Sequence, residues 1–173
     1  MTPRQPLPRR WLMTDERLGD RLFEAIGRLP DDGGIVFRHY RTADRRALFD
    51  RVVEAARERG ILALLAGPAE EAEAWGADGS HGRGPGAGLR TAPAHDLAEI
   101  RAAEAAGAAA LFLSPVFATR SHPDAAALGS ERFARLAAQT RLPVIALGGM
   151  DETRVAALEG AYGWAGVDAW LSG

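Results

Sequence analysis

The sequence predicts an α/β protein, a (β/α)8 barrel of the TIM type, and two observations lead to this prediction. First, short apolar runs alternate with stretches of helical spacing along the whole chain. Such alternation favours a parallel sheet with helices packed against it. Second, the stretch from Gly107 to Met150 reads as strand, polar loop, helix, strand and Gly-Gly turn. Two buried strands joined by a helix form a parallel βαβ unit. A doubly wound open sheet is the alternative, and it normally needs fewer strands.

In the first half of the chain, each element is predicted from an apolar pattern and a stop signal. Asp15 closes the first apolar run, and the segment from Pro30 to Gly34 ends the first helical stretch. The second helix is stopped by Gly60. We expect strands at 11–14, 35–37, 61–65 and 77–81, and helices at 18–29, 45–59 and 68–75. The fourth of these strands has a weak pattern.

The second half repeats the alternation. The strand at 89–92 is weak on its own, whereas the helix that follows has Leu97, Ile100 and Ala103 on one face and Gly107 at its end. We expect the remaining strands at 108–113, 143–147 and 163–167, and helices at 96–106, 130–140 and 153–158. The chain is therefore expected to hold eight strands in one domain spanning residues 1–173.

The chain is short for a barrel. It has 173 residues, whereas such barrels typically run to ~250 and at least ~200. Little sequence follows the eighth strand, so we expect the eighth helix to be missing or vestigial. The face between the last and first strands then needs another cover. A partner subunit, as in a homodimer, or the N-terminal segment rich in Arg and Pro is expected to supply it.

The composition excludes several classes of function. The net charge is −2, which predicts no general attraction to nucleic acid or to an anionic membrane. No apolar run reaches the ~18–20 residues that span a bilayer, and the N-terminus lacks the apolar stretch of a signal peptide. We therefore expect a cytoplasmic protein. The sequence contains no Cys and no Lys, which excludes thiolate chemistry and Schiff-base chemistry. Phosphate must then be held by Arg, by backbone N–H groups or by helix ends.

Candidate anion-binding residues follow three of the predicted strands. Arg38 comes directly after the second strand, and Gly148 and Gly149 follow the seventh, where barrels commonly bind phosphate. The loop after the sixth strand holds Thr119, Arg120, Ser121 and His122, and His122 is a candidate acid or base. The alternatives are a surface arginine, simple turn geometry and a solvated loop. The glycine-rich stretch from His81 to Gly86 is a weaker anion candidate, and its pattern favours a plain flexible loop.

The sequence resembles the thiamine phosphate synthase/thiazole tautomerase (ThiE/TenI) family. The similar segments are WLMTDERL near the start, GADGSH at Gly76–His81, AHDLAEIRAAEAAGA at Ala94–Ala108, SPVFATRSHP at Ser114–Pro123 and LPVIALGGM at Leu142–Met150. They occur in the family's order and span nearly the whole chain. The resemblance implies the same (β/α)8 barrel and a phosphorylated small-molecule substrate.

The resemblance also implies an activity and roles for particular residues. The family's synthase joins a hydroxymethylpyrimidine pyrophosphate to a thiazole phosphate with the help of Mg2+, so Mg2+ is the expected cofactor. By position, Arg38 matches the pyrophosphate-binding arginine after the second strand. Thr119 and Ser121 match the hydroxyl pair of the thiazole-phosphate loop, and Gly149 matches the phosphate-binding glycine after the seventh strand.

The sequence departs from the family pattern where metal would bind. The family's acidic residues after the third strand appear here as Ala66-Gly67-Pro68, and the GRGPGAG stretch after the fourth strand contains no acid. No metal ligand is therefore evident. The family's Ser after the fifth strand falls near Pro93. The tautomerase branch has a catalytic His in the loop after the sixth strand, where this chain has Ser114. Ser114 and His122 are thus the catalytic candidates.

Three hypotheses follow. The first is a thiamine phosphate synthase-like enzyme. The second is a catalytically degenerate or tautomerase-like member that binds a thiazole phosphate or another phosphorylated small molecule. The third is an unrelated phosphate-binding barrel enzyme. Dependence on Mg2+ separates the first two, because a synthase is expected to need the metal and the sequence offers no obvious pair of acids to hold it.

Overall fold

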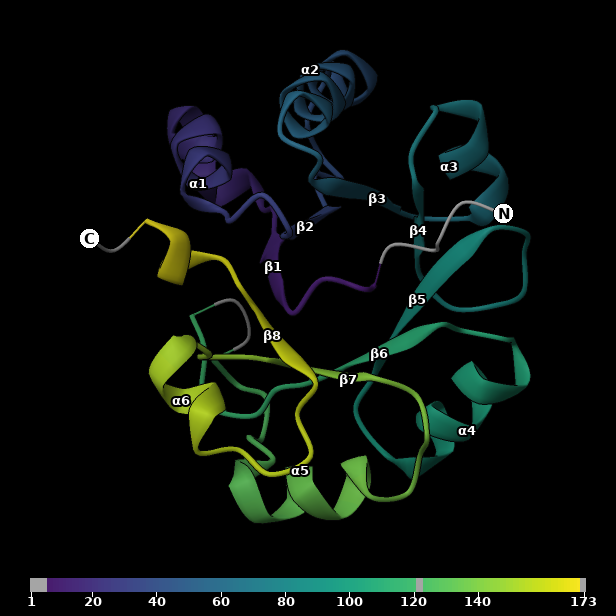
Figure 1. Ribbon diagram of the computed structural model, residues 1–173, viewed down its shortest axis with the longest axis vertical. Coiled ribbons are helices and arrows are strands. Elements are labelled where there is room, and N and C mark those ends of the chain that lie inside the picture. The colour runs from purple at the N-terminus through teal and green to yellow at the C-terminus, as the bar shows by residue number, and fades with distance from the viewer. Residues whose placement is uncertain (1–5, 121–122, 172–173) are drawn as a thin grey trace.

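Eight parallel strands close into a barrel in which each strand pairs with the next and β8 pairs with β1 (Figure 1). The computed structural model describes residues 6–120 and 123–171. The strands are β1 (Arg10–Met13), β2 (Gly34–Phe37), β3 (Leu62–Ala66), β4 (Gly79–His81), β5 (Leu89–Ala94), β6 (Ala110–Leu113), β7 (Val144–Leu147) and β8 (Gly163–Gly166). The predicted (β/α)8 barrel is confirmed, and the doubly wound alternative is wrong.

The helices pack around the outside of the barrel. They are α1 (Leu22–Arg28), α2 (Arg45–Glu58), α3 (Ala69–Ala74), α4 (Leu97–Ala105), α5 (Gly129–Ala137) and α6 (Glu152–Ala156), with 3-10 turns η1 (Glu16–Arg21) and η2 (Asp168–Trp170). In the described part of the chain, residues 82–88 join β4 to β5 without a helix, and η2 alone follows β8. The short eighth element agrees with the prediction. None of the described helices is long and apolar enough to cross a membrane.

Two element boundaries differ from the sequence prediction for identifiable reasons. The expected first helix is not continuous: η1 is interrupted at Gly19, whose φ of 49° and ψ of −130° are not helical, and the α-helix begins only at Leu22. Strand β5 continues to Ala94, two residues past the expected end. Pro93 lies inside it, opposite Phe112 of β6. Proline argues against a strand interior because it cannot donate a ladder hydrogen bond, which explains the early end in the prediction. The extension makes His95 the first residue after β5.

Aromatic side chains fill the barrel interior. Trp11 of β1 and Phe112 of β6, both fully buried, meet edge to face with ring centroids 5.3 Å apart. The indole Nε1–H of Trp11 donates to the carbonyl of Pro8 at 2.8 Å. Gly34 of β2 lies opposite Trp11 in the ladder, and a Cβ on Gly34 would lie 2.3 Å from the indole ring. The large ring therefore requires a residue without a side chain beside it.

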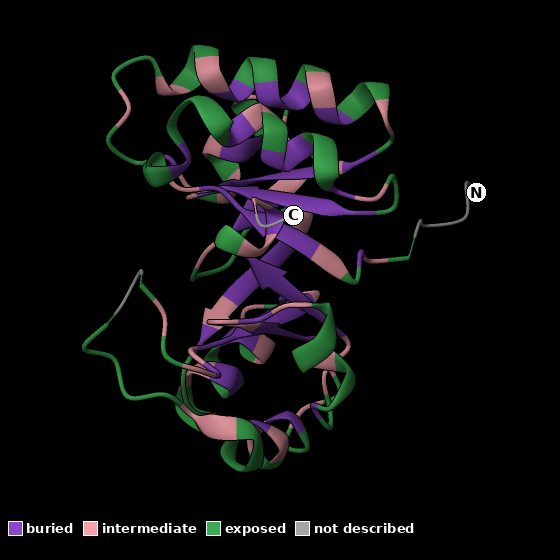
Figure 2. Cartoon of the chain, turned by 90° about the vertical axis from the view of Figure 1, so that its left-hand side faces the viewer, coloured by how far each residue is buried: buried purple, intermediate pink, exposed green. Residues whose placement is uncertain are grey.

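The face between β8 and β1 is covered by η2. The Trp170 ring stacks on Trp164 with centroids 4.9 Å apart, and its Nε1–H donates to the Trp11 carbonyl at 3.0 Å. Figure 2 views the barrel from this side, with the C-terminal segment in front of the buried strands. Residue Arg9 lies at the start of the strands, where its carbonyl accepts the Trp164 N–H at 2.8 Å. Residues 1–5 of the N-terminal segment lie outside the described residues, so cover by that segment and the homodimer both stay predictions.

We predict that Gly34→Ala lowers the free energy of unfolding by about 1–3 kcal/mol, because the new methyl group overpacks the Trp11 ring. Chemical denaturation of the two proteins measures the difference. Gly27→Ala in α1 is the matched control, since a Cβ there meets nothing within 4 Å and alanine favours a helix by up to about 1 kcal/mol. Equal stability of Gly34→Ala and the unchanged protein would contradict the assigned packing.

Candidate functional site

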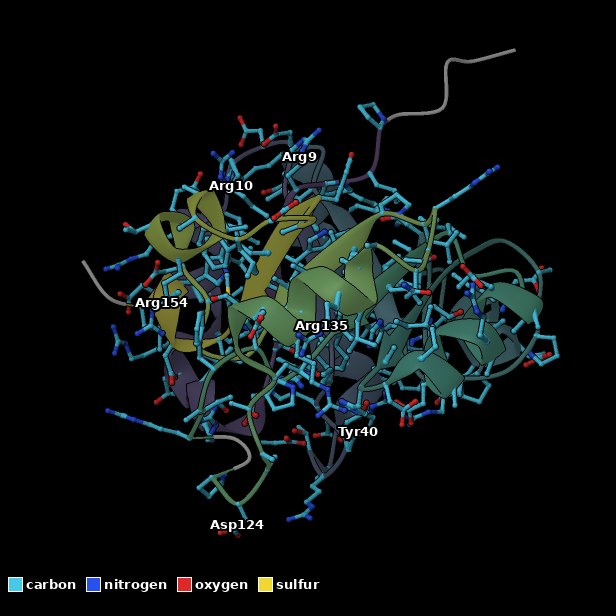
Figure 3. All side chains as sticks on the ribbon, turned by 90° about the horizontal axis from the view of Figure 1, so that it is seen from below. Arg9, Arg10, Tyr40, Asp124, Arg135 and Arg154 are labelled. Carbon is cyan, nitrogen blue, oxygen red and sulfur yellow. The ribbon has the colours of Figure 1, made fainter. Side chains whose placement is uncertain are left out.

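A pocket of about 1180 Å³ opens at the carboxyl ends of the strands. Six of the predicted site residues line it: Arg38, Ser114, Thr119, Arg120, Gly148 and Gly149. Ser121 and His122 lie outside the described residues. Figure 3 sets Tyr40 and Asp124 at this end of the barrel, and Arg9 and Arg10 at the opposite end. Residues from different strands thus meet at one mouth, as a barrel requires.

Arg38 reaches the mouth from the end of β2 and is anchored at one end of its guanidinium. Its Nε donates to the Thr14 carbonyl at 3.2 Å, and its backbone N–H donates to Thr14 Oγ1 at 2.9 Å. Its two terminal nitrogens make no hydrogen bond to the described residues. Burial lowers the pKa of Arg38, and Asp15 opposes that shift, but a guanidinium stays charged at neutral pH. A guanidinium that is fixed at Nε, with both terminal nitrogens unbonded to the described residues, suits a phosphate group.

His39 contacts Thr14, the residue that accepts two hydrogen bonds from Arg38. It is buried, stacks on Phe37 with centroids 4.9 Å apart, and contacts Thr14 Oγ1 through Nδ1 at 2.9 Å. Because Thr14 Oγ1 accepts the Arg38 N–H, its own hydrogen is free to be donated to Nδ1 of His39. This assigns the imidazole proton to Nε2. Burial lowers the pKa of His39, in agreement with a neutral ring. His39 is therefore a packing residue.

The loop after β6 lies directly on Gly148 and Gly149. The N–H of Val116 donates to the Leu147 carbonyl at 2.9 Å, and that of Phe117 donates to the Gly148 carbonyl at 3.1 Å. Any Cβ at Gly148 would lie 2.8 Å from Pro115 Cα. The glycines are therefore needed for this close approach. Neither glycine amide donates to a protein acceptor among the described residues, so both N–H groups remain available to an anion in the pocket.

The mouth carries an excess of positive charge. Its lining includes six arginines, namely Arg17, Arg38, Arg83, Arg90, Arg120 and Arg132, against three acids, namely Glu70, Asp96 and Asp168. Arg120, from the loop after β6, and Arg132, on α5, make no ion pair with the described residues. Both lie on the same side of the mouth as Gly148 and Gly149, since β6, α5 and β7 are consecutive. Positive charge at that side favours a phosphate beside the glycine amides.

His95 directly follows β5 and lines the pocket, and the sequence analysis assigns it no role. Its Nδ1–H donates to the Ser114 carbonyl at 2.7 Å and lies 3.4 Å from Ser114 Oγ. The backbone N–H of His95 donates to Glu99 Oε2, while Asp96 caps α4 by accepting the Glu99 N–H. These contacts fix the ring and leave Nε2 with its lone pair. A neutral imidazole held in this way can act as a base.

His81 is a neutral group inside the mouth. Its Nδ1 lies 2.8 Å from Thr91 Oγ1, and its ring meets Phe112 edge-on. Burial, reinforced by the charges of Arg38 and Arg83, lowers the pKa of His81 to about 3. The ring therefore carries no charge at neutral pH, and the two guanidiniums are the charged groups nearest to it.

The mouth does not fit the magnesium ion that the family resemblance implies. Its three acids follow β3, β5 and β8, so no two come from neighbouring strands. Asp96 is already engaged as the cap of α4. No cluster of three or more His, Cys, Asp or Glu residues that could hold a metal occurs in the described part of the chain. Magnesium prefers convergent oxygen ligands, and the residues at this mouth are mainly cations.

Comparison with known proteins agrees with the barrel. Residues 91–170, just under half of the chain, match the family model described as thiamine monophosphate synthase. Over this segment the chain is similar to the thiamine phosphate synthase/thiazole tautomerase family. The matched segment runs from within β5 through β8, and it holds His95, Ser114 and the two glycines. Its boundaries exclude Arg38, which belongs to the first half of the barrel.

Similar proteins differ in how much of the chain they match. A "Putative thiamine-phosphate synthase 2" of Aquifex aeolicus (strain VF5) is 39% identical over 80 residues, which are 45% of this chain and 43% of that protein. The chain thus matches less than half the length of this curated relative. The thiamine phosphate pyrophosphorylase of Pyrococcus furiosus superposes with a TM-score of 0.75 at 24% identity, over 94% of this chain and 86% of that one. The enzyme of the same name from Bacteroides thetaiotaomicron gives 0.59 at 15% identity, over 94% and 83%. At such identities these structures establish the fold alone.

We predict that the protein loses stability as the pH falls below about 6.5, and that His81→Gln reduces this loss. A histidine held neutral in the folded state takes up a proton more readily when unfolded, so the stability it contributes is complete above the unfolded pKa and declines below it. Between pH 7.5 and 5.5 the loss from His81 is about 1 kcal/mol. Denaturant unfolding of both proteins at the two pH values measures it. An unchanged pH dependence in His81→Gln would contradict the buried neutral ring.

Proposed function

We propose that this protein binds a phosphorylated thiazole in the mouth and acts as a thiamine phosphate synthase-like protein, joining hydroxymethylpyrimidine pyrophosphate to thiazole phosphate. The observation that carries the proposal is the pair of glycines, Gly148 and Gly149, that line the pocket and whose N–H groups donate to no acceptor among the described residues. Arg120 and Arg132 line the same side of the pocket. Backbone N–H groups and guanidiniums are the donors that recognise phosphate. The family match over residues 91–170 supports the choice of a thiazole phosphate as the ligand.

The layout of the mouth supports two phosphorylated reactants. The glycine amides, Arg120 and Arg132 belong to the β6–β7 side of the barrel, whereas Arg38 belongs to β2. In the closed barrel these strands are separated by β8 and β1. A monophosphate on the first side and a pyrophosphate near Arg38 would bring two heterocycles together over the strand ends. Holding two reactants in this way lowers the entropic cost of their reaction.

A proton-transfer role, as in the tautomerase branch, is the second candidate, and the ring of His95 favours it. Its Nδ1–H is held by the Ser114 carbonyl, so Nε2 is the basic atom, in a pocket wall that also contains Ser114. Such a base can remove a proton from the carbon framework of a bound thiazole and return it at another position. This role needs only one phosphorylated ligand and no metal.

We predict that Arg132→Ala weakens the binding of thiazole phosphate by about tenfold, which corresponds to about 1.4 kcal/mol for one charged contact. Calorimetric titration measures the affinity. Arg135→Ala is the matched control, because Arg135 lies on the same helix α5 and pairs with Glu131 outside the pocket. The proposed phosphate site would be wrong if the two variants had the same affinity as the unchanged protein.

We predict that His95→Gln abolishes proton exchange between bound thiazole phosphate and deuterated water, and leaves the affinity within about twofold. Glutamine can still donate to the Ser114 carbonyl, but it cannot act as a base near neutral pH. NMR of the ligand follows the exchange, and calorimetry follows the binding. Formation of thiamine phosphate from both substrates is assayed in parallel. Synthase turnover that survives in His95→Gln, with no exchange in the unchanged protein, would exclude the proton-transfer role.

A further inference from the structure

The β2–β4 side of the mouth brings two guanidiniums together around a neutral ring. Arg38 extends from the end of β2, and Arg83 extends from the connection that follows β4. His81 lies within electrostatic range of both. We propose that these two arginines hold the anionic group of the second reactant directly and take the place of the divalent metal that the family resemblance implies. The inference rests on the proposed function for the kind of ligand, a pyrophosphate or a phosphate.

The guanidinium of Arg38 is preorganised for this task. The Thr14 carbonyl holds Nε, and the two terminal nitrogens have no acceptor among the described residues. A guanidinium that is fixed at Nε presents its remaining N–H groups as a fork, which matches two oxygens of a phosphate. Because the side chain is partly buried, its charge is less screened than that of a fully exposed arginine. One cation of the pair is thus in place before a ligand arrives.

The connection that bears Arg83 is fixed from two directions. Arg83 donates to Glu99 Oε1 at 2.6 Å, which ties it to α4. Arg90, a buried residue of β5, donates through Nη1 to the Gly84 carbonyl at 2.7 Å and through Nη2 to the Ala106 carbonyl. The Gly82 N–H also donates to the Thr91 carbonyl at 3.0 Å. The connection is therefore anchored at both ends of its first turn. Arg83 uses one terminal nitrogen on Glu99 and keeps further N–H groups for a ligand.

The same region is unfavourable for a divalent cation. Glu70 lines the pocket and follows β3, which lies between β2 and β4 in the barrel. In strand order it is therefore the lining acid nearest to Arg38 and Arg83. Two other acids near the arginines are already engaged: Glu99 accepts from Arg83 and from the His95 N–H, and Asp15 accepts from the Arg17 N–H. A magnesium ion at Glu70 would therefore have one carboxylate beside two guanidiniums and would lack its remaining protein oxygens. Two guanidiniums supply about the charge of one divalent ion, and they supply directed hydrogen bonds as well.

The experiment is a calorimetric titration with inorganic pyrophosphate, once in EDTA and once in excess Mg2+. We expect binding in EDTA that Mg2+ does not tighten by more than about twofold. We also expect Arg38→Ala and Arg83→Ala each to weaken binding in EDTA by about tenfold or more. Arg135→Ala on the outer face of α5 is the control and is expected to bind as the unchanged protein does. Arg83→Gln and thermal unfolding of every variant guard against a general loss of structure.

The outcomes separate this inference from the proposed function. Pyrophosphate that binds in Mg2+ but not in EDTA would overturn the inference and leave the thiazole-phosphate site standing. Binding in EDTA that both arginine variants retain would overturn it too, because the anion would then lie elsewhere. If neither pyrophosphate nor thiazole phosphate binds under either condition, the proposed function itself is wrong. Metal-independent binding that both substitutions weaken would establish the arginine pair.

Discussion

The contact between the loop after β6 and the turn after β7 is the constraint on which the mouth depends. Two backbone hydrogen bonds join Val116 to Leu147 and Phe117 to Gly148, and they require that no side chain stand between the two segments. Glycine at 148 and 149 meets that requirement. The same two residues then present their N–H groups to the pocket. A steric need of the fold and a chemical need of an anion site are satisfied by the same pair of glycines.

Arginine supplies the permanent positive side-chain charge of this protein, because the chain has no lysine. Two groups of arginines with different partners matter for the mouth. Arg90 and Arg45 donate hydrogen bonds to backbone carbonyls and fix connections between elements. Arg38, Arg120 and Arg132 keep donors for the pocket. A residue with a planar fork of five N–H groups can serve both purposes, whereas an ammonium could not hold two separate carbonyls at the same time with fixed geometry.

The sequence predicted the barrel, its eight strands and most of the mouth, because these follow from local signals. Buried strands appear as apolar runs, and the residue after each strand must lie at the mouth once the sheet is parallel. Arg38, Gly148 and Gly149 were found in this way. The role of His95 was not found, because Pro93 argued against the last residues of β5 and the ring acquires its orientation from Ser114, a residue of another strand. The excess of arginine at the mouth could not be predicted from the sequence either, because the arginines that line the pocket come from distant parts of the chain.

The connection between β4 and β5 has a consequence for how the protein folds. Parallel neighbours are usually separated by a crossover of about a dozen residues or more, but here Gly79 pairs with Leu89 across residues 82–88 alone. The entropy lost in closing so short a loop is small, and contacts close in sequence form fastest. Pairing of β4 with β5 therefore has the lowest entropic cost of the parallel pairings in the barrel. The two outer edges of this pair are the ones on which β3 and β6 pair in the folded protein.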